Sequence, residues 1–127
     1  MKKLILAFAA FALSMGMMSA QDLATATETY NKGAEAYATS NYTSALDYFK
    51  KALEMAQALG ADGEEVAGNC KNAIPSVILS IGKELYNNKD FDGAVAKITE
   101  AGKVAEEYGN ADVAAQVKEL LPQVTVT

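Results

Sequence analysis

The feature that most constrains the fold of this chain is a residue pattern that returns after 49 positions. Small, aromatic and turn-forming residues of one half recur in the other half in the same order. The pairs are Gly33 and Gly82, Tyr37 and Tyr86, Asn41-Tyr42 and Asp90-Phe91, Ala45 and Ala94, Ala52 and Ala101, and Gly60 and Gly109. A fixed period of this size is typical of stacked repeats, in which one unit cannot bury its own apolar face.

Within each copy the apolar residues recur every three or four positions, which is the period of an amphipathic α-helix. One helix runs through Tyr30 and Tyr37, and another runs from Ala45 to Leu59. No alternation of apolar and polar residues competes with this period. The sequence therefore predicts an all-α, antiparallel helix-hairpin solenoid, with repeat 1 at about 27–75 and repeat 2 at about 76–122.

Turn and cap residues separate the expected helices. Asn41 and Asp90 can each cap the following helix with a side-chain oxygen. Gly60 and Gly109 can adopt the left-handed conformation that ends many helices. Asp62, with a glutamate three positions later, is close to a capping box and predicts the start of a third helix.

Pro75 lies inside this third helical segment. It removes a backbone donor and crowds the carbonyl of Lys71, so the helix is expected to kink or restart there. The apolar positions keep their phase across the proline, which favours a kink or a short break over a reversal.

The N-terminus has the pattern of a secretory signal peptide. Two lysines precede the apolar run at 4–13, and the small residues Ser19 and Ala20 follow. The apolar run is shorter than the about 20 residues that a membrane span needs. We therefore predict a signal peptide at 1–20 that is cleaved after Ala20. The mature protein would be exported to the bacterial periplasm or cell exterior, without stable membrane insertion. The alternative is that this segment stays uncleaved as a membrane anchor.

The charge of the expected mature chain argues against several function classes. It carries nine lysines and sixteen acids, with no arginine and no histidine. Such a chain is poorly suited to nucleic-acid backbones and anionic lipid surfaces. It also lacks the usual base near neutral pH and the usual clamp for phosphate. We therefore expect no enzymatic activity, no cofactor and no nucleic-acid partner.

Metal binding is equally weakly indicated. Zinc requires clustered histidine and cysteine ligands, and Cys70 is the single cysteine. The stretch Asp90-Phe91-Asp92-Gly93 matches only part of a calcium loop and is better explained as a cap and turn. Cys70 lies on an apolar stripe, so we expect a buried side chain, with an intermolecular disulfide as the alternative.

The repeated residues resemble the tetratricopeptide repeat (TPR), a helix–turn–helix unit normally of 34 residues, as found in exported bacterial proteins. Its pattern places a small residue in the first helix and a small, an aromatic and another small residue in the second. These places are filled by Gly33, Ala45, Phe49 and Ala52 in the first copy and by Gly82, Ala94, Ile98 and Ala101 in the second, with Tyr42 and Phe91 at the turn. Small residues let two helices approach closely.

The chain also departs from the TPR pattern. Thr29 and Ile78 replace the large aromatic residue near the start of the first helix, and Gln57 and Glu106 replace the proline that ends the second. The longer period extends the connecting helix and changes the expected superhelix pitch.

The resemblance implies a concave groove for peptides or partner segments along the first helix of each pair. It places Tyr30, Ala34, Tyr37, Leu79, Lys83, Tyr86 and Asn87 on this groove. Tyrosines offer large contact area, although packing between helices is the alternative for each of them. Lys83 would select acidic or carboxylate groups. The resemblance therefore implies a non-enzymatic adaptor or scaffold of the cell envelope that binds a protein or peptide.

Two other functions remain open from the sequence. The last five residues fall where a third copy would begin, and solenoids usually need about three repeats for stability. The chain would then be a fragment of a longer array, or it would self-associate through open repeat ends as a structural scaffold. A carbohydrate-binding accessory role, with exposed tyrosines stacking on sugar rings, is the other alternative.

Overall fold

The computed structural model describes residues 22–125, so the predicted signal peptide lies outside the described residues. Every regular element in this part is helical, which confirms the predicted all-α class. The elements are a first helix at residues 22–38, α2 (Tyr42–Ala58), the short 3-10 helix η1 (Gly60–Gly63), α3 (Glu64–Asn87), α4 (Phe91–Tyr108) and α5 (Ala111–Thr125). Among these helices none has both the length and the apolar character needed to cross a membrane.

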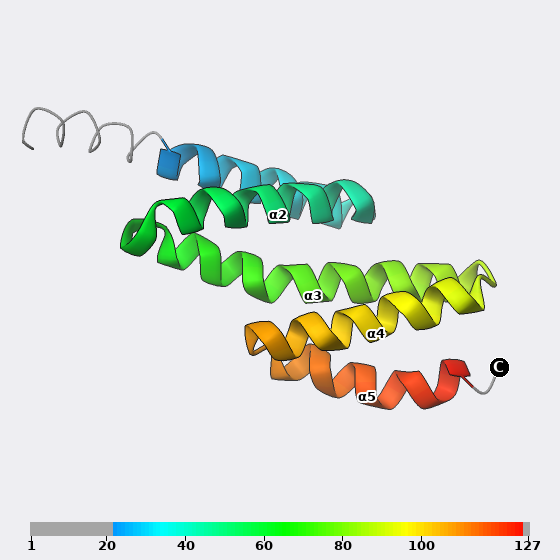
Figure 1. The fold of residues 1–127 in the computed structure, drawn as a ribbon. Helices are drawn as coiled ribbons and strands as arrows, with labels where there is room; N and C mark the ends of the chain where they lie inside the picture. Colours follow the sequence, from blue (N-terminus) through cyan, green and yellow to red (C-terminus); the bar gives the residue numbers. More distant parts are fainter. Residues whose placement is uncertain (1–21, 126–127) are drawn as a thin grey trace, which may run out of the picture.

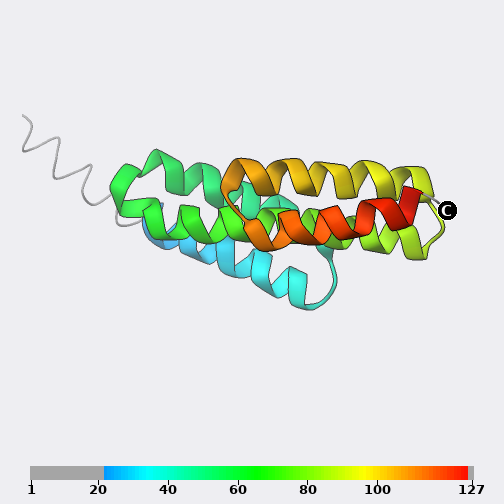
Figure 2. The same cartoon turned by 90° about the horizontal axis from the view of Figure 1, so that it is seen from below.

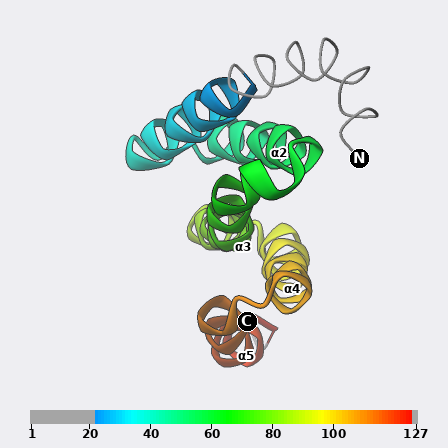
Figure 3. The same ribbon diagram turned by 90° about the vertical axis from the view of Figure 1, so that its left-hand side faces the viewer.

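Each helix packs mainly against its neighbours in sequence. α3 lies between α2 and α4, and α5 packs on α4 and also touches α3. The first helix packs on α2, where the ring centroids of Tyr30 and Phe49 are 5.1 Å apart. The helices therefore follow one another in a row from the first helix to α5, each reversing the direction of the one before (Figures 1 and 3). Figure 2, which looks along this row, shows α3 lying across it, with α2 toward one end of α3 and α4 toward the other.

The two turns that precede α2 and α4 have nearly the same backbone. Ser40 and Lys89 are both left-handed, with φ of 63° and 67°. The next residues, Asn41 and Asp90, have φ/ψ of −91°/73° and −90°/79°. The amide of each donates a hydrogen bond of 2.8 Å to the carbonyl five residues earlier. The turn geometry thus recurs at the same spacing as the sequence pattern.

One of the two predicted turn caps forms. Asp90 accepts a hydrogen bond of 3.0 Å from the amide of Gly93, which confirms the cap of α4. Asn41 makes no side-chain cap bond to α2, so the cap prediction was wrong there. A Cβ on Gly93 would lie 2.6 Å from a carboxylate oxygen of Asp90. The equivalent of Gly93 in α2 is Ser44.

The predicted left-handed glycines are confirmed, with φ of 65° at Gly60 and 75° at Gly109. The predicted capping box at Asp62 is wrong, because Asp62 lies inside η1 and the residue before α3 is Gly63, without a side-chain cap. Gly63 is buried, and a Cβ there would meet the carbonyl oxygen of Ala56. The backbone of this turn is therefore held by packing on α2 and not by a capping side chain.

α3 continues from Glu64 to Asn87 with Pro75 inside it, so of the two predicted alternatives, a kink or a restart, the restart does not occur. Pro75 and the flanking Ile74, Val77 and Ile78 are all buried. An internal proline costs a helix about 3 kcal/mol, whereas burying one large aliphatic side chain contributes about 1.5–3 kcal/mol. Burial on both sides of the proline therefore outweighs the lost hydrogen bond. α5 likewise continues past Pro122 to Thr125.

The eight residues at the small and aromatic positions of the TPR pattern within the helices are all buried, whereas the turn residues Tyr42 and Phe91 are half-buried and exposed, respectively. Two of the eight are glycines at helix crossings. A Cβ on Gly33 would lie 2.8 Å from the ring of Phe49, and one on Gly82 would lie 2.7 Å from Cγ1 of Ile98. The first helix approaches α2, and α3 approaches α4, at positions where the glycine adds no side chain and the side chain of the partner helix fills the contact.

We expect Gly82→Ala to destabilise the protein by about 1–3 kcal/mol, because the added methyl overpacks the crossing with Ile98. Gly68→Ala is the matched control in the same helix. Nothing lies within 4 Å of a Cβ on Gly68, so the higher helix propensity of alanine should stabilise the protein by up to about 1 kcal/mol. Urea unfolding measures both changes. Equal effects at the two glycines would contradict the close crossing.

We expect Asp90→Ala to cost about 1 kcal/mol of unfolding free energy, the usual loss for a capping side chain. Asn41→Ala removes a residue at the same place in the other turn, but no cap bond is lost. Its cost should be clearly smaller in the same urea titration. A larger loss at Asn41 than at Asp90 would contradict the difference between the turns.

Candidate functional site

The seven predicted groove residues do not share one environment. Leu79 is only 3% exposed and belongs to the core. Tyr30 is half-buried against Phe49, so it packs between helices as the alternative interpretation held. Tyr86 is half-buried, and the exposed members are Ala34, Tyr37, Lys83 and Asn87. The structure therefore brings together only the members on the last two turns of α3, namely Lys83, Tyr86 and Asn87.

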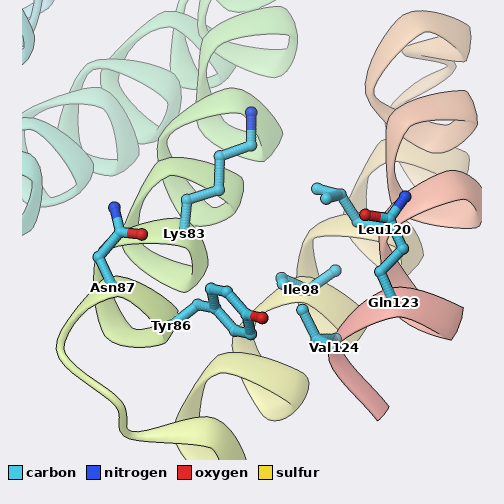
Figure 4. A pocket seen from close by; sticks show the side chains of 7 residues that line it. All are labelled: Lys83, Tyr86, Asn87, Ile98, Leu120, Gln123 and Val124. Carbon is cyan, nitrogen blue, oxygen red and sulfur yellow. The ribbon is translucent and has the colours of Figure 1, made fainter. Parts of the chain in front are cut away.

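These α3 residues border a pocket of about 230 Å³, here called the apolar pocket (Figure 4). Its other walls come from the two following helices. The complete lining is Lys83, Tyr86 and Asn87 of α3, Ile98 of α4, and Leu120, Gln123 and Val124 of α5. Ile98 and Val124 are 1% and 5% exposed, so they form a fixed apolar floor.

A second pocket of about 230 Å³, here called the polar pocket, lies on the other side of the same α3 residues. It is lined by Ser40, Tyr42, Ser80, Lys83, Glu84 and Asn87. Lys83 and Asn87 line both pockets. The C-terminal half of α3 thus separates a mainly hydroxyl- and amide-lined pocket from a mainly apolar one.

Aromatic contacts fix the walls of both pockets. The ring of Tyr86 lies 5.3 Å from that of Phe91, centroid to centroid, and its hydroxyl end points toward Ile98 (Figure 4). At the polar pocket the ring of Tyr37 lies 5.4 Å from that of Tyr42. The Tyr37 hydroxyl is 3.0 Å from Oγ of Ser80. Tyr37 therefore joins the first hairpin to α3 and supports the pocket wall.

Lys83 is the cation of this surface. Its side chain is exposed and extends along α3 away from Tyr86 (Figure 4). Within residues 22–125 the ion pair closer than 4 Å is Lys97 with Glu100, at 3.1 Å, and Lys83 forms none. The other charged residue in the two linings is Glu84, in the polar pocket. Lys83 is therefore available to an anionic group of a ligand.

Sequence reasoning missed the contribution of α5. Leu120 and Val124 line the apolar pocket from a helix that the repeat pattern treats only as a connector. Their spacing of four residues marks one apolar helix face, which was the available signal. Residues of the first turn, Ser40 and Tyr42, were likewise not assigned to the groove.

A third and more open pocket of about 520 Å³ lies between the first helix and α2. Its lining is mostly polar and consists of Lys32, Glu35, Ala36, Thr39, Asn41, Ser44 and Tyr48. None of the predicted groove residues belongs to it.

Burial shifts the pKa values of two groups that lie in or against the core, Cys70 and Tyr30. The predicted burial of Cys70 is confirmed, since it has no exposed surface. Burial raises the pKa of its thiol to about 11. Burial also raises the pKa of Tyr30, with a smaller contribution from the nearby Cys70 sulfur. Both shifts favour the neutral form, which is the unreactive form of a thiol. In residues 22–125 no three acidic, histidine or cysteine side chains gather as metal ligands.

Comparisons of the chain with protein-family models, with curated proteins and with solved structures find no match in any of the three. Its function is therefore inferred from its own residues and geometry.

We expect Cys70 to make stability fall with rising pH above pH 9. The folded state holds the thiol protonated up to a pKa of about 11, whereas the unfolded chain loses this proton near its ordinary value of 9.0. Stability is thus fully present below pH 9 and is lost between pH 9 and 11, by about 2–3 kcal/mol in total. Urea unfolding of the wild type and of Cys70→Ala measures the difference, in which other titrations cancel. A difference that stays constant over this range would contradict the shift.

Proposed function

We propose that the chain is a TPR-like helical solenoid that binds a protein or peptide segment without chemical conversion. The observation that carries this proposal is the position of Lys83 and Asn87 between the apolar and the polar pocket. The recurrence of the turn geometry and of the glycine crossings supports the stacked-hairpin arrangement. The sequence pattern at 1–20 supports export, with an adaptor role in the cell envelope.

Pocket size favours a segment over a small-molecule substrate. Ligand pockets for whole small molecules usually measure about 300–1,000 Å³ and enclose most of the ligand. The apolar pocket and the polar pocket, which Lys83 and Asn87 border, each measure about 230 Å³, which suits one side chain. Two such pockets on either side of one helix suit successive side chains of a chain that crosses α3.

A non-enzymatic role agrees with where the shifted pKa values lie. Catalytic groups usually have pKa values tuned toward the working pH and sit in a cleft. Here the thiol of Cys70 is moved away from neutral pH and lies in the core. The pocket surface offers contact area, a cation and an amide, which are binding groups.

End-to-end self-association is less well supported than groove binding. Thr25, Glu28 and Lys32 on the first helix are exposed. Their equivalents 49 positions later in α3 are Ile74, Val77 and Ile81, which pack in or against the core. The outer face of the first helix therefore lacks the apolar core that a stable interface between copies would bury.

Sugar stacking on tyrosines is also less well supported. Tyr37 and Tyr86 already have aromatic neighbours, Tyr42 and Phe91, at 5.4 and 5.3 Å. These contacts leave less ring face for a carbohydrate.

Selection from a random-sequence peptide display library tests the proposal. We expect the wild-type protein to enrich peptides whose affinity for Lys83→Ala/Asn87→Ala falls by at least about tenfold, or 1.4 kcal/mol. The matched control is Asn69→Ala/Lys103→Ala, which changes the same residue types at exposed positions outside both pockets. Circular dichroism and thermal melts check that all variants stay folded.

Peptides that bind the pocket variant as tightly as the wild type would contradict the proposal. Failure to enrich any peptide would contradict it as well.

A further inference from the structure

We infer that the bound segment carries a bulky apolar residue beside an acidic residue, and that the apolar side chain enters the apolar pocket while the carboxylate meets Lys83. This inference rests on the proposed function and adds the chemical class of the partner. It is carried by the different chemistry of the two pockets that share Lys83 and Asn87.

The apolar anchor follows from the walls of the first pocket. Its floor is the buried pair Ile98 and Val124, and Leu120 and the ring of Tyr86 form facing walls from α5 and α3 (Figure 4). An apolar side chain placed there leaves water and contacts carbon on several sides, which is the main source of affinity in segment binding. A polar side chain pressed against Ile98, Leu120 and Val124 would lose its hydration without a matching partner on these three walls.

The acidic neighbour follows from charge. Lys83 lies at the border of the apolar pocket, is exposed, and forms no ion pair within residues 22–125. An exposed ammonium without an ion-pair partner can pair with a carboxylate that the apolar anchor holds beside it, although the gain from such an exposed pair is modest. Glu84 lines the polar pocket and repels an acid on that side. The acidic residue of the segment therefore lies at Lys83, next to the apolar anchor. The residue of the segment that lies at the polar pocket is neutral or basic.

The net charge of the protein limits how acidic the partner can be. The full chain has a formal charge of −5, and charges beyond about 8–10 Å are largely screened at physiological salt. A run of acids would bring further carboxylates near Glu84 without a second cation in the two linings, whereas a single acid in contact with Lys83 would gain the local attraction. The partner is thus a segment with one acid beside an apolar residue, and not an acidic tail.

Charge reversal at Lys83 tests the acidic neighbour. Peptides selected on the wild-type protein are synthesised with amidated C-termini, so that side-chain carboxylates alone can meet the lysine. We expect an acid beside an apolar residue in these peptides, and at least about tenfold weaker binding when that acid becomes lysine. Lys83→Glu should reverse this preference. Lys103→Glu makes the same charge change on exposed α4 surface outside both pockets and should leave it unchanged.

Two leucines of α5 test the apolar anchor. Leu120 and Leu121 are both half-buried and pack against the core, but only Leu120 lines the apolar pocket. We expect Leu120→Ala to weaken the binding of the selected peptides and to reduce the preference of the protein for peptides with a bulky apolar residue. Leu121→Ala should keep both affinity and preference if its thermal melt shows that the fold is intact.

The outcomes separate the inference from the proposed function. If peptides bind in a Lys83- and Asn87-dependent way without an acid beside an apolar residue, or only with a free C-terminal carboxylate, the inference is wrong and the proposed function stands. An unchanged acid preference in Lys83→Glu, or equal effects of the two leucine variants, also overturns the inference. If no selected peptide depends on Lys83 and Asn87, the proposed function itself fails.

Discussion

The arrangement of this chain depends on the close contact of helices at two glycines. Gly33 lies against the ring of Phe49, and Gly82 lies against Ile98, each too close for a Cβ. At the second crossing the buried Gly82 is followed by the exposed Lys83. The contact between Gly82 and Ile98 fixes α3 on α4. It therefore also directs Lys83 and Asn87 outward and places Ile98 beneath them, so one helix crossing determines both the packing and the candidate site.

The two copies share their geometry but not their surface. The positions equivalent to Lys83 and Asn87 in the first helix are Ala34 and Ala38, both exposed. The cation and the amide thus occur in the second copy alone, between the first turn and α5. The repeat supplies the scaffold, and substitutions on one face distinguish the helix that bears the candidate site from the helix that does not.

The period and the apolar phase were enough to predict the helices, the turns and the left-handed glycines, because these features depend on residues near one another in sequence. Asn41 was wrongly assigned as a cap, because the residue type shows only that its side chain can cap a helix and not which way the side chain turns. For the site, periodicity placed Leu79 with Lys83 on one face. It could not show that Leu79 is covered by the core, since that depends on how far neighbouring helices enclose α3.

The contribution of α5 to the site depends on a short linker: residues 109–110 connect α4 to α5, whereas residues 59–63 connect α2 to α3. In the first copy the residue before α3 is the buried Gly63, held against α2. In the second copy Asn110 stands at this place, where its Oδ1 accepts from the amide of Val113 at 3.1 Å and its Nδ2 donates to the carbonyl of Asn72 at 3.0 Å. One side chain thus caps α5 and ties its start to α3. Because α5 leaves from a fixed point on α3, its apolar face closes the pocket beside Lys83, and a difference between the repeats becomes a feature of the site.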